Sequence, residues 1–310
     1  MTKSSYIFLI FYLFLFGFLY GNDENNNSIL DNRSTRQSIY DEPLKIFWFY
    51  NLSNVEHLRN TSDVESLIIS YSANSNASLD LSFINEIPQL SQLKKLHIGS
   101  GQNVENTESL KRLTNLEELT ISGLDLTNID ITPIAELKSL KILNLIDLYH
   151  IYDISVISFL QNLEHLVISN CNNIKSLDPI FEITGLKWLQ IVSNAEYDLT
   201  NIDKLQELEL LNIRINNHEN IINISRLYNL TRLVIQFDVI DDVSPLLNLI
   251  NLEELIFLGE NVNILPLSAI STLKYIVVRF STREKYLEFI ANEGNIFERN
   301  GISIYTGVPH

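Results

Sequence analysis

The 310-residue chain contains one cysteine and few basic residues, and both shortages limit what it can do. Because Cys171 is the only cysteine, no intramolecular disulfide is available and the core must hold without covalent cross-links. The 22 Lys and Arg residues are outnumbered by 38 Asp and Glu residues, which gives a net charge of −16. Such a charge repels nucleic-acid phosphates and anionic lipid head groups at long range. Nucleic acid is therefore not expected as a partner.

The sequence also lacks the motifs that mark common active sites and metal sites. It contains no H-E-x-x-H, G-x-S-x-G or C-x-x-C motif and no phosphate-binding glycine loop. The six histidines are scattered, and His97 and His165 fall on predicted strands too far apart to share a metal ion. We therefore predict no catalytic residue, no metal site and no cofactor, and a protein that is not an enzyme.

The first 22 residues have the composition of a targeting segment. Lys3 supplies a positive charge, and residues 6–20 form an apolar run broken only by Gly17. The run is shorter than the ~20 residues that span a bilayer comfortably as a helix, so we predict a secretory signal peptide at residues 1–22. Retention as an N-terminal anchor is the alternative. Residues 23–40 are polar and rich in Asn and Ser, which predicts a flexible leader.

One motif, L-x-x-L-x-L with Ile, Val or Phe at some positions, recurs through most of the remaining chain. Its nine units are residues 93–98, 116–121, 140–145, 163–168, 186–191, 208–213, 230–235, 252–257 and 273–278. A spacing of 21 to 24 residues is typical of the leucine-rich repeat, in which each unit contributes one short strand. Less regular units at residues 44–49 and 64–69 predict two more strands. The predicted fold is an α/β solenoid, a leucine-rich-repeat horseshoe with about eleven strands in a curved parallel sheet.

A second apolar segment follows each strand, and proline marks its start in three repeats. Pro133, Pro179 and Pro245 each follow a Thr, Asp or Ser, a pattern typical of a helix cap with proline at the first helical position. Few residues are available in each unit. We therefore predict single 3₁₀ or α-helical turns on the convex face, opposite the sheet.

The C-terminal residues follow a different pattern. Ser281 and Glu284 have the spacing of a capping box, and Gly294 is expected to end the helix that this box begins. Asn300 and Gly301 then predict a turn into a final strand that covers the last sheet edge. The predicted domains are a solenoid with its N-terminal cap at residues 41–280 and a C-terminal cap, a helix plus a strand, at residues 281–310.

The repeats resemble the internalin-like and phosphatase-regulator-like leucine-rich repeats of about 22 residues. The resemblance rests on phrases such as Leu-Thr-Arg-Leu-Val-Ile at residues 230–235 and Asp-Asp-Val-Ser-Pro-Leu at residues 241–246, and it covers residues 64–280. It departs at the loop position that these repeats usually fill with Asn for a buried hydrogen-bond ladder. That position holds Gly101, Leu124, Leu148, Cys171, Asn194, Asn216, Asp238 and Glu260. We expect Cys171 to be a small buried packing residue there. The resemblance implies a binding scaffold and names no ligand.

Outward-facing residues of neighbouring strands should line up as columns about 4.8 Å apart across the concave face. The column after the first leucine alternates in charge, which predicts ion pairs that fix the register, with a charged recognition strip as the alternative. Its members are Lys94, Glu117, Lys141, Glu164, Lys187, Glu209, Thr231, Glu253 and Lys274.

The middle of the concave face is apolar and aromatic, with arginine at its margin. This composition is typical of the centre of a protein interface. The predicted partner-binding residues are Ile142, His165, Val167, Trp188, Val192, Leu210, Arg214, Arg232 and Tyr275. The alternative is that the C-terminal helix or a second copy of the chain covers them.

These features favour a secreted or surface-displayed module that binds a protein partner through its concave face. Adhesion or host interaction is implied by the family resemblance alone. The alternatives are an intracellular regulatory or scaffolding subunit and an envelope protein that self-associates through the strand edge at residues 44–49. A membrane is expected to be met only through an uncleaved N-terminal segment. Asn-x-Ser/Thr sequences, which matter only in a host that glycosylates secreted proteins, begin at Asn26, Asn32, Asn51, Asn60, Asn76, Asn223 and Asn229.

Overall fold

A computed structural model gives the fold of most of the repeat region. It describes residues 46–49, 58–59, 64–70, 78–99, 103–123, 129–237, 240, 242–259, 263–279 and 282–307. The predicted signal peptide at residues 1–22 and the predicted leader at residues 23–40 lie outside the described residues. None of the helices in the described ranges combines the length and the hydropathy that a membrane span requires.

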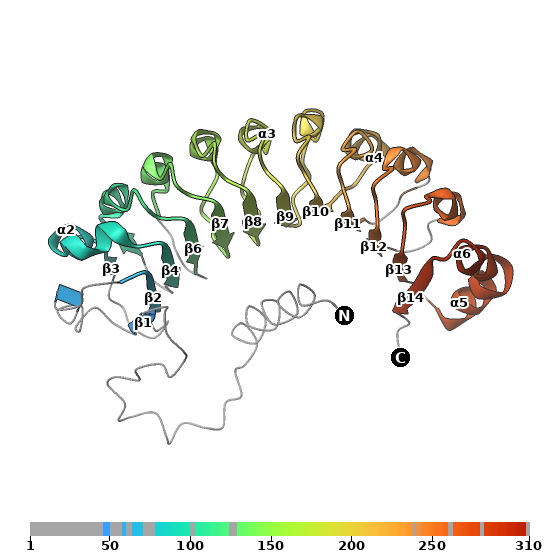
Figure 1. Cartoon of the computed structure of the whole chain (residues 1–310), viewed down its shortest axis with the longest axis horizontal. Coiled ribbons are helices and arrows are strands. Elements are labelled where there is room, and N and C mark those ends of the chain that lie inside the picture. The colour runs from blue at the N-terminus through green and yellow to red at the C-terminus, as the bar shows by residue number, and fades with distance from the viewer. Residues whose placement is uncertain are drawn as a thin grey trace, which may run out of the picture. The chain divides into compact units, whose positions relative to one another are not determined.

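Each repeat contributes one short strand to a single parallel sheet, and the strands lie on the concave side of the arc that the repeats form (Figure 1). In order across the sheet they are β1 (Ile46–Phe49), β2 (Ser66–Ser70), β4 (Lys95–Gly99), β6 (Glu118–Ser122), β7 (Ile142–Ile146), β8 (His165–Ser169), β9 (Trp188–Val192), β10 (Leu210–Arg214), β11 (Arg232–Gln236), β12 (Glu254–Leu258), β13 (Tyr275–Arg279) and β14 (Ser303–Gly307). Among the described residues this sheet has 12 strands, about as many as expected. A separate two-stranded pairing joins β3 (Leu79–Asp80) to β5 (Val104–Glu105).

The strand register stacks the apolar residues of each motif into a continuous core. Leu119 pairs with Leu143 and Ile121 pairs with Leu145, and all four side chains are fully buried. Because successive strand residues point to opposite faces, the residues between them face away from the core. Burying each such Leu or Ile side chain contributes roughly 1.5–3 kcal/mol, so the repeated leucines account for the fold.

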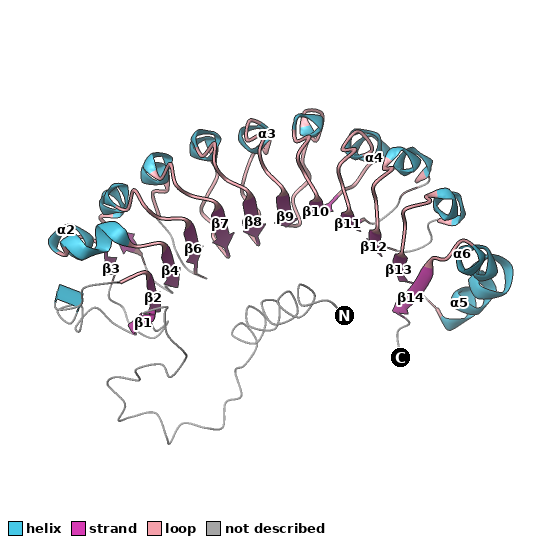
Figure 2. Ribbon diagram, in the orientation of Figure 1, coloured by secondary structure: helices cyan, strands magenta, loops and turns pink. Residues whose placement is uncertain are grey.

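The convex face is formed by short helical turns, as predicted (Figure 2). They are α2 (Phe83–Glu86), η2 (Pro88–Gln92), η3 (Thr107–Arg112), η4 (Thr132–Glu136), η5 (Ser155–Phe159), α3 (Asp178–Phe181), η6 (Ile202–Lys204), α4 (His218–Ile224), η7 (Ser244–Asn248) and η8 (Leu265–Ala269). Each has three to seven residues. The prediction of short 3₁₀ or α-helical segments is confirmed, although η3 with 6 residues and α4 with 7 residues are longer than the single turns expected.

The predicted caps of these turns are wrong by one residue. Thr132 is the first helical residue of η4 and Pro133 the second, and no side chain of the N-cap residue caps the turn. Instead, the backbone N–H of Thr132 donates to Asp130 Oδ1 at 2.8 Å, and that of Ser244 donates to Asp242 Oδ1 at 2.8 Å. The short Asp side chain closes a turn with the amide two residues later, so it satisfies the donor that a cap would otherwise take.

An asparagine ladder is present, but it lies just before the strands and not in the loops that follow them. In four repeats the residue before the first leucine donates its side-chain amide to a backbone carbonyl of the preceding repeat. The pairs are Asn115 to Ser91 (2.9 Å), Asn162 to Lys138 (2.8 Å), Asn229 to Gln206 (2.7 Å) and Asn251 to Tyr228 (2.9 Å). These bonds tie neighbouring repeats together.

Cys171, in the loop position usually filled by Asn, is fully buried as predicted. Its Sγ lies 3.5 Å from the backbone carbonyl of Leu145 and 3.4 Å from that of Ser169, either of which can accept its single S–H proton. Burial raises the pKa of the Cys171 thiol to about 11, which keeps it protonated at neutral pH. A protonated, buried thiol is a poor nucleophile, in keeping with a packing role.

The C-terminal end differs from the prediction in two details. Helix α5 (Arg283–Phe289) begins after Thr282, whose side chain accepts the N–H of Lys285, so the N-cap lies one residue later than predicted. The helix also does not end at Gly294, because a π-helical turn, η9 (Ile290–Gly294), leads directly into α6 (Asn295–Arg299). Gly301, with φ of 77°, then turns the chain into β14, which pairs with β13.

Candidate protein-binding surface

The register brings the outward-facing residues together in three columns across the concave face. The first column is Lys95, Glu118, Ile142, His165, Trp188, Leu210, Arg232, Glu254, Tyr275 and Ser303. The second is His97, Thr120, Asn144, Val167, Gln190, Asn212, Val234, Ile256, Val277 and Tyr305. The third is Gly99, Ser122, Ile146, Ser169 and Val192 on β4 to β9, and Arg214, Gln236 and Leu258 on β10 to β12.

The charged column beside them forms the predicted cross-strand ion pairs. Glu117 pairs with Lys94 at 3.1 Å and with Lys141 at 2.9 Å. Glu164 pairs with Lys187 at 3.1 Å, and Glu253 pairs with Lys274 at 2.5 Å. Hydrogen bonds from Lys141 and Lys94 lower the pKa of Glu117. Because these side chains are largely exposed, the pairs specify register more than they stabilise the fold.

Between β4 and β7 the concave face is mainly polar, apart from Ile142 and Ile146 on β7, and several of its polar groups bond to one another. Asn144 Nδ2 donates to Thr120 Oγ1 at 2.9 Å, and both residues are more than nine-tenths buried. His97 Nε2 lies 3.5 Å from Ser122 Oγ, and burial lowers the pKa of His97. A Cβ atom at Gly99 would lie 3.1 Å from His97 Nε2, so the absence of a side chain there makes room for the ring. Little hydrogen-bonding capacity is left here for a partner.

From β8 onward exposed aromatic and aliphatic residues appear on the face among polar ones. The His165 and Trp188 rings lie with their centroids 5.6 Å apart and their planes tilted by 39°. Burial lowers the pKa of His165, which favours the neutral imidazole at pH 7. Val167 is partly exposed on the adjacent column, and Val192 is 37% exposed at the end of β9. These four side chains are partly exposed outward residues of the adjacent strands β8 and β9.

The structure brings most of the predicted binding residues together but places two of them differently from the expectation. Ile142, His165, Trp188 and Leu210 are consecutive in the first column, on β7 to β10. Leu210 is only 7% exposed, so it forms the floor of the surface and is not available for contact. Tyr275 lies on β13, separated from Leu210 by Arg232 and Glu254. It therefore belongs to a second group of residues.

That second group is organised around a half-buried ion pair. Arg232 Nε donates to Glu254 Oε2, and the two side chains are 28% and 21% exposed. The hydrogen bond from Arg232 lowers the pKa of Glu254 against the effect of burial, while burial and a hydrogen bond to Glu254 raise the pKa of Tyr275 to about 12. The Tyr275 ring meets that of Tyr305 edge-on, with centroids 5.9 Å apart.

Two exposed residues of this surface were missed by the sequence prediction. Leu258 is 42% exposed at the end of β12, and Tyr305 is 58% exposed on β14. Leu258 follows the buried Phe257 and Tyr305 follows the partly buried Ile304, so the alternation of inward and outward strand residues could have identified both. We use the name C-terminal concave surface for the outward residues of β8 to β14, with Trp188, Val192, Leu258, Tyr275 and Tyr305 as its main members.

Two other predicted features can be placed in the structure. Among the described residues, no three His, Cys, Asp or Glu side chains lie close enough to hold a metal ion. Asn223 of the possible glycosylation sequences is 5% exposed on α4, and the amide of Asn229 donates to the Gln206 carbonyl. The other five sequences, from Asn26 to Asn76, begin outside the described residues.

Comparisons with known proteins identify the fold of the chain. A family profile described as "Plant disease resistance protein RPS2-like, leucine-rich repeats" matches residues 72–190. The chain has the leucine-rich-repeat fold. Leucine-rich-repeat proteins generally mediate protein–protein interaction. No significant match was found among curated protein sequences.

Two solved structures share this leucine-rich-repeat fold. An internalin (inlF) of Listeria monocytogenes is 20% identical, with a TM-score of 0.56, over 82% of this chain and 69% of the internalin chain. A chain of the Toll–Spätzle complex of Drosophila is 16% identical, with a TM-score of 0.58, over 83% of this chain and 36% of that one. The predicted resemblance to internalin-like repeats is thus confirmed for the fold.

Proposed function

We propose that this leucine-rich-repeat chain is a protein-binding module that holds a protein partner on its C-terminal concave surface. The supporting observation is the change of character along one face. Polar groups on β4 to β7 satisfy one another, whereas Trp188, Tyr275 and Tyr305 on β9 to β14 stay partly or largely exposed beside the Arg232–Glu254 pair. Aromatic side chains with arginine nearby are the residues that most often dominate binding energy at protein interfaces.

We further propose that the module acts outside the cytoplasm, secreted or displayed on the surface, in adhesion or interaction with a host. The apolar run and positive charge within residues 1–22 support export, and the fold resemblance to an internalin supports an extracellular role. Fractionating cells and mass-mapping the first peptide tests this part. A chain that begins near Asn22 outside the cytoplasm is expected, and an intact N-terminus in the cytosol would contradict it.

The binding proposal is tested by capture with matched variants. The immobilised full chain is exposed to solubilised proteins of neighbouring or host cells, alongside Trp188→Ala and Phe159→Ala variants. Phe159 is a suitable control because it is 59% exposed but lies on the convex turn η5. We expect a protein that the wild type and Phe159→Ala retain and Trp188→Ala loses. Equal retention by all three chains would place binding elsewhere.

A further inference from the structure

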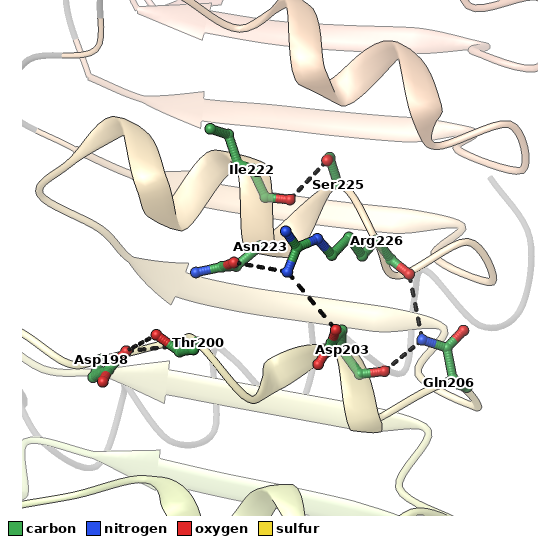
Figure 3. Close-up of polar contacts among 8 residues, drawn as sticks. All are labelled: Asp198, Thr200, Asp203, Gln206, Ile222, Asn223, Ser225 and Arg226. Atoms are coloured by element: carbon green, nitrogen blue, oxygen red, sulfur yellow. Dashed lines mark hydrogen bonds and ion pairs between the residues drawn. The ribbon is translucent and has the colours of Figure 1, made fainter.

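The charged groups around the convex turns η6 and α4 keep their charge in mild acid. Thr200 donates its hydroxyl at 2.6 Å and its backbone N–H at 2.9 Å to Asp198 Oδ1, and both bonds lower the pKa of Asp198 (Figure 3). In the same view, Arg226 NH1 lies 3.8 Å from Asp203 Oδ2. Carboxyl groups ordinarily titrate near about pH 4 and guanidinium groups above about pH 12, so contacts of this kind do not change between about pH 5 and 7.5.

The C-terminal concave surface differs, because it contains a histidine. Among the described outward side chains of β8 to β14, Glu254 is the single carboxylate and His165 the single imidazole. Against the effect of burial, the hydrogen bond from Arg232 lowers the pKa of Glu254 and keeps it ionised. Arginine and tyrosine side chains ordinarily titrate above about pH 9. His165 is therefore the described group of this surface whose charge can change between about pH 5 and 7.5.

His165 lies at the aromatic centre of the surface. Its ring centroid is 5.6 Å from that of Trp188, and the two planes are tilted by 39°. On the other side, Ile142 of β7 is its neighbour in the first column. Neither neighbour carries a charge. A protein that covers Trp188 must therefore also cover the adjoining imidazole and remove part of its water.

The charges around the imidazole do not offset this loss of water. The charged side chains that act on it are Glu164, Lys187, Glu209 and Glu118. Lys187 pairs with Glu164 at 3.1 Å, and Glu118 pairs with Lys95 at 2.8 Å. Burial lowers the pKa of His165 and outweighs the three carboxylates, which favour the protonated ring. Further burial under a partner should act in the same direction.

We propose that protonation of His165 weakens partner binding, so that the C-terminal concave surface holds its partner at neutral pH and releases it in mild acid. The inference rests on the proposed function, since it needs a partner that covers Trp188. An imidazolium loses more hydration free energy on burial than a neutral imidazole does. Binding and protonation therefore oppose each other, and affinity should fall by up to about tenfold per pH unit below the pKa of the free ring.

Acid elution from the immobilised full chain tests the proposal, with solubilised proteins of neighbouring or host cells as the probe. The wild type, loaded at about pH 7.5, should release its partner at about pH 5. His165→Gln removes the titrating group, so the protein that this variant retains at neutral pH should stay bound in acid. His97→Gln is the matched control, because burial also lowers the pKa of His97, but this residue lies on β4, outside the surface. It should release the partner as the wild type does. Circular dichroism at the lower pH confirms that each chain is folded.

A second measurement needs only the wild-type chain. Calorimetric titration of the captured partner in two buffers of different ionisation enthalpy should show a net release of protons on binding at about pH 6. Proton uptake would overturn the inference, as would a partner that His165→Gln releases in acid to the same extent as the wild type, and either result would leave the proposed function standing. A chain that captures no protein at any pH would overturn both.

Discussion

The two ends of the concave face share one backbone and one core but differ in what they offer a partner. On β4 to β7, buried Thr120 and Asn144 bond to each other, and Lys95 pairs with Glu118 at 2.8 Å. On β8 to β14 the corresponding columns also hold polar residues, but they include the partly or largely exposed Trp188, Val192, Leu258, Tyr275 and Tyr305. Inward residues thus specify the fold in both regions, and the outward residues alone distinguish the region that we propose to bind a partner.

The largest expected effect tests whether the two regions share one core. Phe257 is fully buried on β12 and meets Phe237 edge-on, with ring centroids 5.6 Å apart. Phe257→Ala should destabilise the chain by about 3–5 kcal/mol, and Leu119→Ala on β6 by about 2–5 kcal/mol. Chemical denaturation should show a single transition for both variants. Separate transitions for the two ends would mean that the halves fold independently and would break the comparison.

The second prediction compares how much the two ends of the concave face contribute to partner affinity. Trp188→Ala should weaken binding of the captured partner by at least ~2 kcal/mol, or about 30-fold, because it removes the largest aromatic side chain of the surface. Lys95→Ala, at the same column position on β4, should change affinity less than about threefold, as expected for an exposed ion pair. Calorimetric titration of both variants measures the difference. Similar losses would assign binding to the whole face.

A smaller effect concerns stability of the polar region. Asn144→Ala removes the donor to the buried Thr120 hydroxyl and should cost about 1–3 kcal/mol of unfolding free energy. Gln190→Ala, in the same column but partly exposed on β9, should change it by less than about 0.5 kcal/mol. Urea denaturation of the two variants provides the comparison. An equal loss of unfolding free energy in both variants would show that the hydrogen bond between Asn144 and Thr120 does not stabilise β4 to β7.

The smallest effect is a pH dependence present in both regions. Burial lowers the pKa of His97 on β4 and of His165 on β8 below their ordinary value of 6.5. Both histidines therefore bind a proton more tightly in the unfolded chain than in the folded chain. The stability that the two neutral imidazoles contribute is present above pH 6.5 and is lost as the pH falls through their lowered pKa values. Imidazole NMR titrations should give both midpoints below 6.5. A midpoint above it would mean that the ring is more solvated, or closer to carboxylates, than described.

Much of the fold follows from the sequence, because the repeat period and the inward leucines specify strands, register and columns. The alternating charges from Lys94 to Lys274 predicted the cross-strand ion pairs that the structure contains. The exact residues at which helices begin and end could not be predicted, because they depend on the backbone conformation of single residues. The turns that contain Pro133 and Pro245 are closed by Asp130 and Asp242, one residue before the helix N-cap, and Gly294 continues a helix that it was expected to end.

The candidate site was less predictable than the fold, because exposure depends on neighbours from several strands. Outward position alone suggested that Leu210 is available, yet it is nearly buried between its neighbours in the first column. Leu258 and Tyr305 also occupy outward positions and prove to be among the exposed hydrophobic residues. The sequence identifies the face of a strand, whereas side-chain packing across strands decides which residues on that face can be reached.

The most direct test of the central claim is site-specific photo-crosslinking to the captured partner. A photoreactive residue is placed in turn at Val192 on β9, at Ser122 on β6 in the same column, and at Phe159 on the convex turn η5. The account predicts a crosslink from Val192 and none from Ser122 or Phe159. A crosslink from Phe159 or Ser122 without one from Val192 would contradict a binding site on the C-terminal concave surface.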